Sequence, residues 1–128
     1  AASTFVLTYD DYLTLDDLEN LIRPSSYRGA PVELLTLSAC QTAAGDDKAA
    51  LGLAGVAIKA GARAALASLW FVSDQASALM VDEFYRALAK PGTSKAQALK
   101  HAQTVLRNDP RFRHPRYWAP YIMIGNWL

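Results

Sequence analysis

Cys40 is the side chain of this sequence that best combines a nucleophilic atom with an informative position. It is the only cysteine, and it stands in the stretch LLTLSACQTAAG, where an apolar, strand-like run passes into a polar loop containing glycine. In open parallel α/β sheets, active sites lie outside the carboxyl ends of the strands. The thiolate is the reactive form of cysteine, and a nearby helix amino terminus lowers the pKa of a thiol. Two interpretations stay open: a nucleophile, or a small buried apolar side chain.

Ser73 and Asp74 are a second pair of residues that could do chemistry. They follow a buried apolar segment in the stretch LWFVSDQ. A carboxylate at such a position would favour a basic group of a ligand, by direct charge pairing in a partly dry pocket. The same two residues also fit an ordinary helix start, in which serine caps the backbone and the acid interacts with the helix dipole.

The two histidines are weaker candidates for catalysis. A general base must lie within hydrogen-bond reach of the sulfur or of the leaving group. His101 falls in the middle of an expected helix, one position off its apolar stripe, and His114 precedes Pro115. We expect structural positions for both. One cysteine and two histidines do not make a disulfide or a recognisable metal site, so we expect no metal and no other cofactor.

An arginine-rich stretch, LRNDPRFRHPRYW, offers a different chemistry. It mixes basic and aromatic side chains that can contact phosphates and stack on bases, namely Arg107, Arg111, Arg113 and Arg116 with Phe112, Tyr117 and Trp118. The formal net charge of the whole chain is only +1, which supplies no general attraction to nucleic acid or to an anionic membrane. We therefore expect a solvated rim over the edge of a core.

Hydrophobic spacing predicts the elements that would position these residues. The near-continuous apolar run PVELLTLSA is typical of a strand buried on both faces, and RAALASLW predicts a second one. Between them a small, apolar helix is expected from about Lys48 to Ala60, terminated by Gly61 in a left-handed conformation. Residues 32–70 then form a β-α-β unit, which should have parallel strands and a right-handed crossover.

The flanking segments predict further helices and strands. FVLTY reads as a strand or short hairpin, and a helix capped by Thr14 should bury Leu18, Leu21 and Ile22 before Arg23-Pro24 ends it. A helix from about Asp74 to Ala89 and a second one with a Ser94–Gln97 capping box are expected next. Their predicted inward positions are Ala76, Leu79, Met80, Phe84, Ala87 and Leu88 in the first, and Ala96, Leu99, Ala102 and Leu106 in the second. A last strand is expected around Tyr121 to Ile124.

Length and composition fit one compact domain. The chain has 128 residues, of which 52% are hydrophobic. It contains no apolar stretch approaching the ~20 residues of a membrane span. A single cysteine fits a reducing cytoplasm. Because the sequence starts in the middle of strand-like residues, we expect a fragment or a processed product.

Five blocks of the sequence, taken in order, resemble the CHAT domain, a caspase-like domain often joined to tetratricopeptide repeats. They are VELLTLSACQTAAG, LGLAGVAIKAGARAALASLWFVSDQAS, VDEFYRAL, SKAQALKHAQ and HPRYWAPYIMIGNW. Caspases themselves carry Gln-Ala-Cys-Arg-Gly around their cysteine, so the likeness is to the CHAT group. It implies a three-layer α/β caspase-like sandwich with a mostly parallel sheet, of which residues 1–128 are the carboxyl-terminal part of one domain.

The resemblance also implies a function. It is that of a cysteine endopeptidase with a Cys-His dyad, in which Cys40 takes the place of the nucleophile. In caspase-like folds the loop after the second strand helps to form the substrate pocket, so Ser73 and Asp74 become candidate substrate-binding residues with a preference for a basic substrate residue. The alternative is a non-catalytic protein-interaction module with the same fold.

The family's catalytic histidine belongs to a His-Gly motif at the end of the strand before the cysteine strand. No histidine precedes Cys40 here. We therefore expect the histidine-bearing segment upstream of Ala1, an inactive isolated chain, and an open sheet edge beside the strand that leads to Cys40. The expected partners are that upstream segment, tetratricopeptide repeats of the same or a partner protein, and a protein or peptide substrate. No membrane partner is expected, and nucleic acid is disfavoured.

Overall fold

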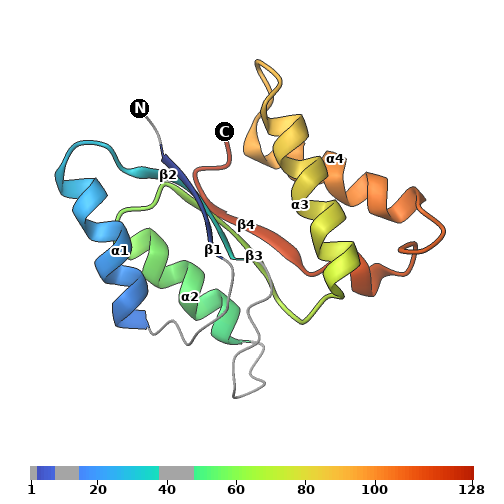
Figure 1. Cartoon of the computed structure of the whole chain (residues 1–128), viewed down its shortest axis with the longest axis horizontal. Coiled ribbons are helices and arrows are strands. Elements are labelled where there is room, and N and C mark those ends of the chain that lie inside the picture. Colours follow the sequence, from blue (N-terminus) through green and yellow to red (C-terminus); the bar gives the residue numbers. More distant parts are fainter. Residues whose placement is uncertain (1–2, 8–14, 38–47) are drawn as a thin grey trace.

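The computed structural model describes residues 3–7, 15–37 and 48–128. They form four strands, four α-helices and one 3-10 turn (Figure 1). In chain order these are β1 (Ser3–Leu7), α1 (Leu15–Tyr27), β2 (Val32–Leu37), α2 (Lys48–Lys59), β3 (Ala64–Ser68), α3 (Asp74–Leu88), α4 (Lys95–Asn108), η1 (Pro115–Tyr117) and β4 (Tyr121–Gly125).

The strands make one four-stranded sheet in the order β1-β2-β3-β4. β1 pairs parallel with β2, β2 pairs parallel with β3, and β4 runs antiparallel to β3. The parallel β-α-β unit expected from residues 32–70 is therefore confirmed, with α2 as its crossover helix. Two of the three pairings are parallel, which agrees with a mostly parallel sheet.

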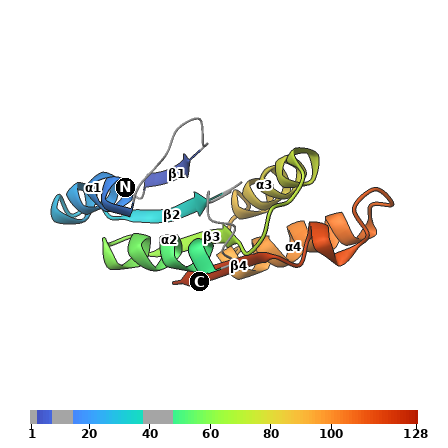
Figure 2. The same ribbon diagram turned by 90° about the horizontal axis from the view of Figure 1, so that it is seen from below.

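Helices cover both faces of the sheet, so the described part of the chain has three layers (Figures 1 and 2). One apolar core lies between the sheet and α3 and α4, and it includes Leu34, Leu66 and Phe84. The other lies between the sheet and α1 and α2, and it includes Leu18, Leu35 and Ala57. This arrangement confirms the α/β class. The specific likeness to a caspase sandwich stays a prediction.

Burial on both faces explains the composition of the two inner strands. All five residues of β3 are buried, and all of them are alanine except Leu66 and Ser68. Small side chains on both faces let the helices pack closely against this strand. In β2 only Glu33 is not buried. Leu34 and Leu35 join different cores because successive side chains of a strand point to opposite faces.

The end of α2 shows the predicted glycine termination. Gly61 has a φ of 114°, its N–H donates to the carbonyl of Ile58 at 3.0 Å, and the N–H of Ala62 donates to the carbonyl of Ala57 at 3.0 Å. These are the two hydrogen bonds of a Schellman motif, which satisfy carbonyls at the helix end. The chain then turns directly into β3.

Two helix predictions need correction. α1 does not end at Arg23-Pro24, because it continues through Pro24 to Tyr27. A proline removes its own N–H from the helix but its carbonyl still accepts, here from the N–H of Arg28 at 3.2 Å, so the last turn can form. In addition, Leu21 is 55% exposed, since the buried row of α1 is the narrow pair Leu18 and Ile22, four residues apart.

In α4 the predicted inward position Ala96 is also wrong. The buried residues are Lys95, Ala98, Leu99, Ala102 and Leu106. This row starts at Lys95 and repeats every three or four residues, so Ala96 is turned about 100° away from its start. No local sequence pattern indicates that a lysine stands at the start of the apolar row.

The expected open edge beside β2 is wrong as well. β1 lies there, with Phe5 opposite Leu35 and Leu7 opposite Leu37. Both sides of β2 are therefore paired, and among the described residues β1 and β4 are the outer strands of the sheet. A histidine-bearing strand added upstream would have to pair outside β1 or displace it. Among the residues that the structure describes, no helix is long and apolar enough to cross a membrane.

Candidate functional site

The carboxyl ends of β2 and β3 lie at the same edge of the sheet. Leu37, the last residue of β2, is opposite Ala67, and β3 ends one residue later. The loop of residues 69–73 leaves the sheet from this edge and leads into α3. Cys40, the predicted nucleophile, lies three positions beyond Leu37 in the sequence and outside the described residues.

The loop of residues 69–73 is fixed by contacts with the segment that leads into β4. The N–H of Leu69 donates to the carbonyl of Pro120 at 2.9 Å, and the indole N–H of Trp70 donates to the carbonyl of Arg116 at 3.0 Å. The hydroxyl of Ser68 donates to the carbonyl of Trp70, and Val72 is buried in the core. The loop is therefore held at both ends, and side chains on it are presented in a defined position.

Ser73 has the structural role that the sequence predicted. Its side-chain oxygen accepts the N–H of Ala76 at 3.4 Å, and its carbonyl accepts the N–H of Ser77 at 2.9 Å, so it caps α3. The hydroxyl proton of Ser73 is not used in this bond, because a serine hydroxyl can donate one hydrogen bond while it accepts others. Its capping role is confirmed, and its role in substrate binding stays a prediction.

Asp74 is exposed in the first turn of α3. No Lys or Arg of the described segments forms an ion pair with it. Asp82, further along the same helix, differs because it pairs with Arg86 at 2.8 Å. A carboxylate at this position is favoured by the helix dipole. It is also free to meet a cation of a ligand that lies along the sheet edge.

Two exposed aromatic side chains beside Ser73 were missed from the sequence. Trp70 is 44% exposed and Phe71 is 54% exposed. Trp70 was predicted to be the end of the buried strand, since the run RAALASLW is mostly apolar. The signal that could have predicted their exposure is the helix cap at Ser73. Residues between the end of the strand and this serine must form a short loop, and loops lie at the surface.

Hydroxyl pairs connect the helices to the sheet below this edge. The hydroxyl groups of Thr36 and Tyr85 lie 2.6 Å apart, and those of Ser77 and Tyr121 lie 3.0 Å apart. Burial raises the pKa of Tyr85 and of Tyr121 above the ordinary value, although the hydrogen bonds act in the opposite direction. Both phenols are therefore neutral near pH 7, and they tie α3 to β2 and β4.

The two histidines make structural contacts, as expected. Nε2 of His101 lies 3.2 Å from a carboxylate oxygen of Glu83, which links α4 to α3 at the surface. Nδ1 of His114 accepts the N–H of Arg116 at 3.2 Å and so caps η1. Within the described ranges, no group of three or more His, Cys, Asp or Glu side chains is arranged to hold a metal ion.

The arginine-rich stretch forms a rim over the edge of the core. Phe112 is buried and meets Tyr117 edge to face, with ring centroids 5.4 Å apart. Arg111 lies over the ring of Phe112 at 4.9 Å and forms an ion pair with Asp109 at 2.8 Å. The hydrogen bonds from Arg111 hold the pKa of Asp109 below its usual value. Phe112 is thus committed to the core and is not a surface on which bases can stack.

Comparisons with known proteins give one family and two curated relatives. The model of the CHAT domain matches residues 1–126. Tetratricopeptide repeat protein 28 of Homo sapiens is 33% identical over 98 residues, and its counterpart in Mus musculus is 34% identical over 97 residues. These alignments cover 75% and 74% of this chain but only 4% of each relative, so the chain spans a small part of their length. No solved structure matches.

Proposed function

Because this chain belongs to the CHAT domain family, we propose that it forms the nucleophile-bearing part of a caspase-like cysteine endopeptidase domain. Cys40 is the nucleophile. Its thiolate attacks the carbonyl carbon of a peptide bond, and backbone amides near the cysteine stabilise the oxyanion. The C–N bond then breaks, a histidine from an upstream segment protonates the leaving amine, and water hydrolyses the resulting thioester to release the acid and the thiol.

The observation that carries this proposal is the parallel pairing of β2 and β3. Their carboxyl ends lie side by side, and functional groups of parallel α/β sheets gather at that edge. Cys40 follows β2 in the sequence by three positions, and the anchored loop of residues 69–73 follows β3. A substrate lying along this edge would meet both segments.

The substrate in this proposal carries a basic residue before the cleaved bond. Asp74 supplies the negative charge, and no cation of the described residues neutralises it. Ser73 supplies a hydroxyl that can donate to a substrate carbonyl while its oxygen accepts the N–H of Ala76. The exposed Trp70 and Phe71 offer apolar surface next to this charge. A single cysteine that has to stay a free thiol suits a reducing compartment, and the cytoplasm is the proposed location.

The partners follow from the relatives. Those proteins are named for tetratricopeptide repeats, and the aligned region is a small fraction of their length. We infer that this domain also works beside such repeats, in the same or in a partner protein. Repeat arrays present extended concave surfaces, which suits the delivery of a protein substrate or of an activating ligand.

A non-catalytic interaction module is the second candidate. It is favoured by the engagement of both histidines in contacts of their own, His101 with the carboxylate of Glu83 and His114 with the N–H of Arg116. In this alternative the exposed Trp70 and Phe71 bind a partner and no bond is broken.

Cleavage by the full-length protein distinguishes the two. Peptides with Arg or Lys before the scissile bond should be cut by the full-length protein in the presence of its activator, and Cys40→Ala should abolish cutting. Asp74→Asn should lower kcat/KM for these peptides about tenfold or more, because it removes a charge-assisted contact, whereas the control Asp82→Asn on the same helix should not. Cleavage that survives Cys40→Ala, or a full-length protein that cuts no peptide, would replace the peptidase by the interaction module.

A further inference from the structure

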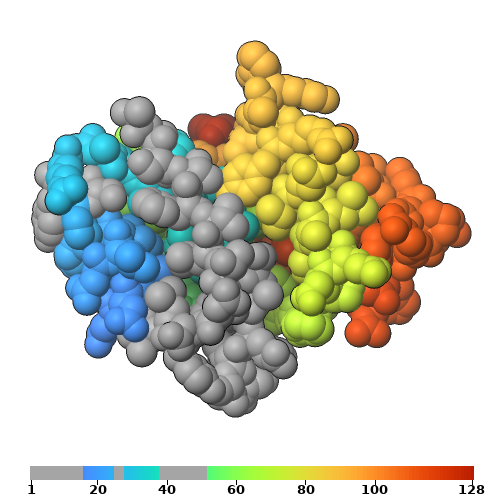
Figure 3. Space-filling model, in the orientation of Figure 1, coloured from blue at the N-terminus to red at the C-terminus, as the bar shows by residue number. Residues whose placement is uncertain are grey.

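The small net charge of the chain conceals a strong asymmetry. Residues 95–128 contain six of the 13 Lys and Arg residues but only one of the 12 Asp and Glu residues, Asp109. The helix α4 carries no acid between Lys95 and Asn108. α4 and the turn after it lie at one end of the molecule, whereas α1 with Asp16, Asp17 and Glu19 lies at the other (Figures 1 and 3). α4 and the turn after it therefore make this end of the chain basic, although the neighbouring α3 also carries the acids Asp74, Asp82 and Glu83.

A groove lies on this basic end. It has a volume of about 190 Å³ and is lined by Lys100, Gln103, Thr104 and Arg107 of α4 and by Trp118. We call these five residues the basic groove. The side-chain amide of Gln103 donates to the carbonyls of Trp118 at 2.8 Å and of Tyr121 at 3.4 Å, which holds α4 against the segment entering β4.

The walls of the groove are fixed by contacts of their own. The indole N–H of Trp118 donates to the carbonyl of Arg113 at 3.1 Å, and the hydroxyl of Thr104 donates to the carbonyl of Lys100 at 2.8 Å. The neutral donors of the groove are thus satisfied within the chain. What the groove still offers to a ligand is the apolar surface of Trp118 and the charges of Lys100 and Arg107.

Those two charges lack partners. Lys100 and Arg107 are exposed, and no acid of the described segments forms an ion pair with either one. Some other cations of the described residues are paired, such as Arg63 with Glu33 and Arg111 with Asp109. Seven residues along a helix separate Lys100 from Arg107 by about 10 Å, so they stand at opposite ends of the groove.

We propose that the basic groove binds an acidic segment of a partner polypeptide, with carboxylates on Lys100 and Arg107 and an apolar group against Trp118. The size of the groove favours this occupant. Pockets for small ligands hold about 300–1,000 Å³, so 190 Å³ is small for a nucleotide and fits side chains. In an extended polyproline II segment, acids three residues apart lie on one side about 9 Å apart, which matches the spacing of the two cations.

Peptide binding tests the proposal. A fluorescent peptide with glutamate at every third position is titrated with the chain, and its anisotropy is compared with that of the same peptide carrying glutamine. Lys100→Gln/Arg107→Gln should weaken binding of the glutamate peptide about tenfold, since two exposed charge pairs are lost. The control Lys59→Gln/Lys90→Gln removes the same charge from exposed lysines outside the groove, and it should leave the affinity within about twofold. Circular dichroism verifies that both variants fold.

Three outcomes would overturn the proposal. Equal weakening by both double variants would mean attraction to net charge alone. Tighter binding of a single-stranded oligonucleotide, with the same dependence on Lys100 and Arg107, would make nucleic acid the occupant. A sedimentation experiment in which the chain self-associates through the groove, and loses this association in Lys100→Gln/Arg107→Gln, would make a second copy the occupant. The peptidase proposal is untouched by these results, because no groove residue takes part in it.

Discussion

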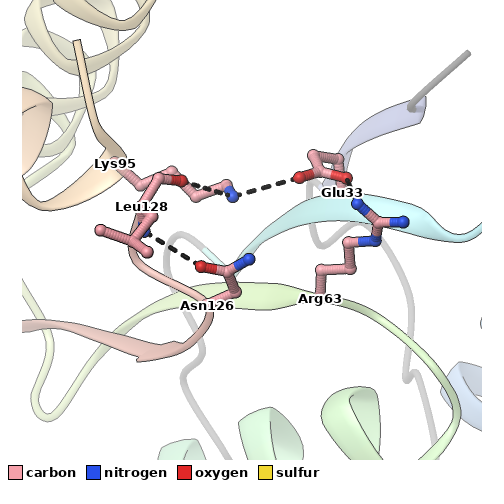
Figure 4. Close-up of polar contacts among 5 residues, drawn as sticks. All are labelled: Glu33, Arg63, Lys95, Asn126 and Leu128. Carbon is pink, nitrogen blue, oxygen red and sulfur yellow. Dashed lines mark hydrogen bonds and ion pairs between the residues drawn. The ribbon is translucent and has the colours of Figure 1, made fainter. Parts of the chain in front are cut away.

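The ammonium group of Lys95 lies 3.3 Å from a carboxylate oxygen of Glu33 and joins the first residue of α4 to the amino-terminal end of β2 (Figure 4). Lys95 is only 5% exposed. Its Nζ also donates to the carbonyl of Leu128 at 3.2 Å, and Arg63 approaches the other carboxylate oxygen of Glu33 at 3.3 Å. This cluster lies at the edge of the sheet opposite the carboxyl ends of β2 and β3, so it stabilises the fold away from the candidate site.

Glu33→Gln should destabilise the protein by about 2 kcal/mol, because a buried lysine that loses its counter-charge keeps the cost of desolvation. Urea denaturation measures this change. The matched control is Asp82→Asn, which breaks an exposed pair with Arg86 and should cost less than about 0.5 kcal/mol. Equal losses of unfolding free energy in the two variants would show that the burial of Lys95 does not make its pairing with Glu33 more important than an exposed pair.

The hydroxyl pair of Thr36 and Tyr85 should show strong coupling in a double-mutant cycle. Thr36→Val keeps the size of the side chain but leaves the phenol of Tyr85 without its partner, which should cost about 1–2 kcal/mol. The double variant Thr36→Val/Tyr85→Phe should cost less than the sum of the single variants, because neither hydroxyl is then left unpaired. Additive losses would mean that the two hydroxyl groups do not stabilise each other.

Stability should fall at alkaline pH through Tyr85 and Tyr121. Burial raises the pKa of both phenols, so the unfolded chain loses these protons at a lower pH than the folded one. The stabilisation that the neutral phenols contribute is therefore complete below about pH 10, the ordinary tyrosine pKa. It is lost as the pH rises through the higher pKa values of the folded state. Urea midpoints measured from pH 8 upward should decline less steeply in Tyr85→Phe than in the unmodified protein. An unchanged slope would assign the alkaline loss to other groups.

Two glycines should respond to alanine in opposite directions. Gly125 has a φ of 92°, and a Cβ there would lie 2.4 Å from the carbonyl oxygen of Arg63, so Gly125→Ala should destabilise by about 2 kcal/mol or more. A Cβ on Gly55, inside α2, would meet no heavy atom within 4 Å apart from its chain neighbours and the nearby backbone of its own helix. Gly55→Ala should therefore stabilise by about 0.5–1 kcal/mol through helix propensity. Thermal unfolding of the two variants decides the sign of each change.

Local signals predicted the helix ends correctly where the chemistry is confined to a few residues. Ser73 and the Ser94–Gln97 capping box fall where they were expected, since a cap needs only its own first turn. The end of α1 was predicted wrongly at Pro24, because a proline near the end of a helix removes one hydrogen bond without preventing the last turn.

Features that depend on distant residues were not predictable in the same way. Lys95 is buried because Glu33 and Leu128, far away in the sequence, supply its partners. The place of β1 beside β2 depends on strand pairing, which a single strand pattern does not specify. Of the candidate site, the sequence identified the cap and the acid at Ser73 and Asp74. It missed the exposed Trp70 and Phe71, because their exposure is set by how the loop is anchored to Pro120 and Arg116.

Cys40 should react with iodoacetamide in the folded chain faster than in the same chain unfolded in urea. A thiol activated at a strand end has an apparent pKa below the ~8.5 of a free thiol, so its rate near pH 7 exceeds that of the unfolded reference. Mass spectrometry assigns the label without ambiguity, because Cys40 is the only cysteine. His101→Ala and His114→Ala should leave the rate unchanged, since both histidines are engaged in contacts of their own. Labelling that occurs only in urea would make Cys40 a buried apolar side chain and remove the nucleophile from the proposed mechanism.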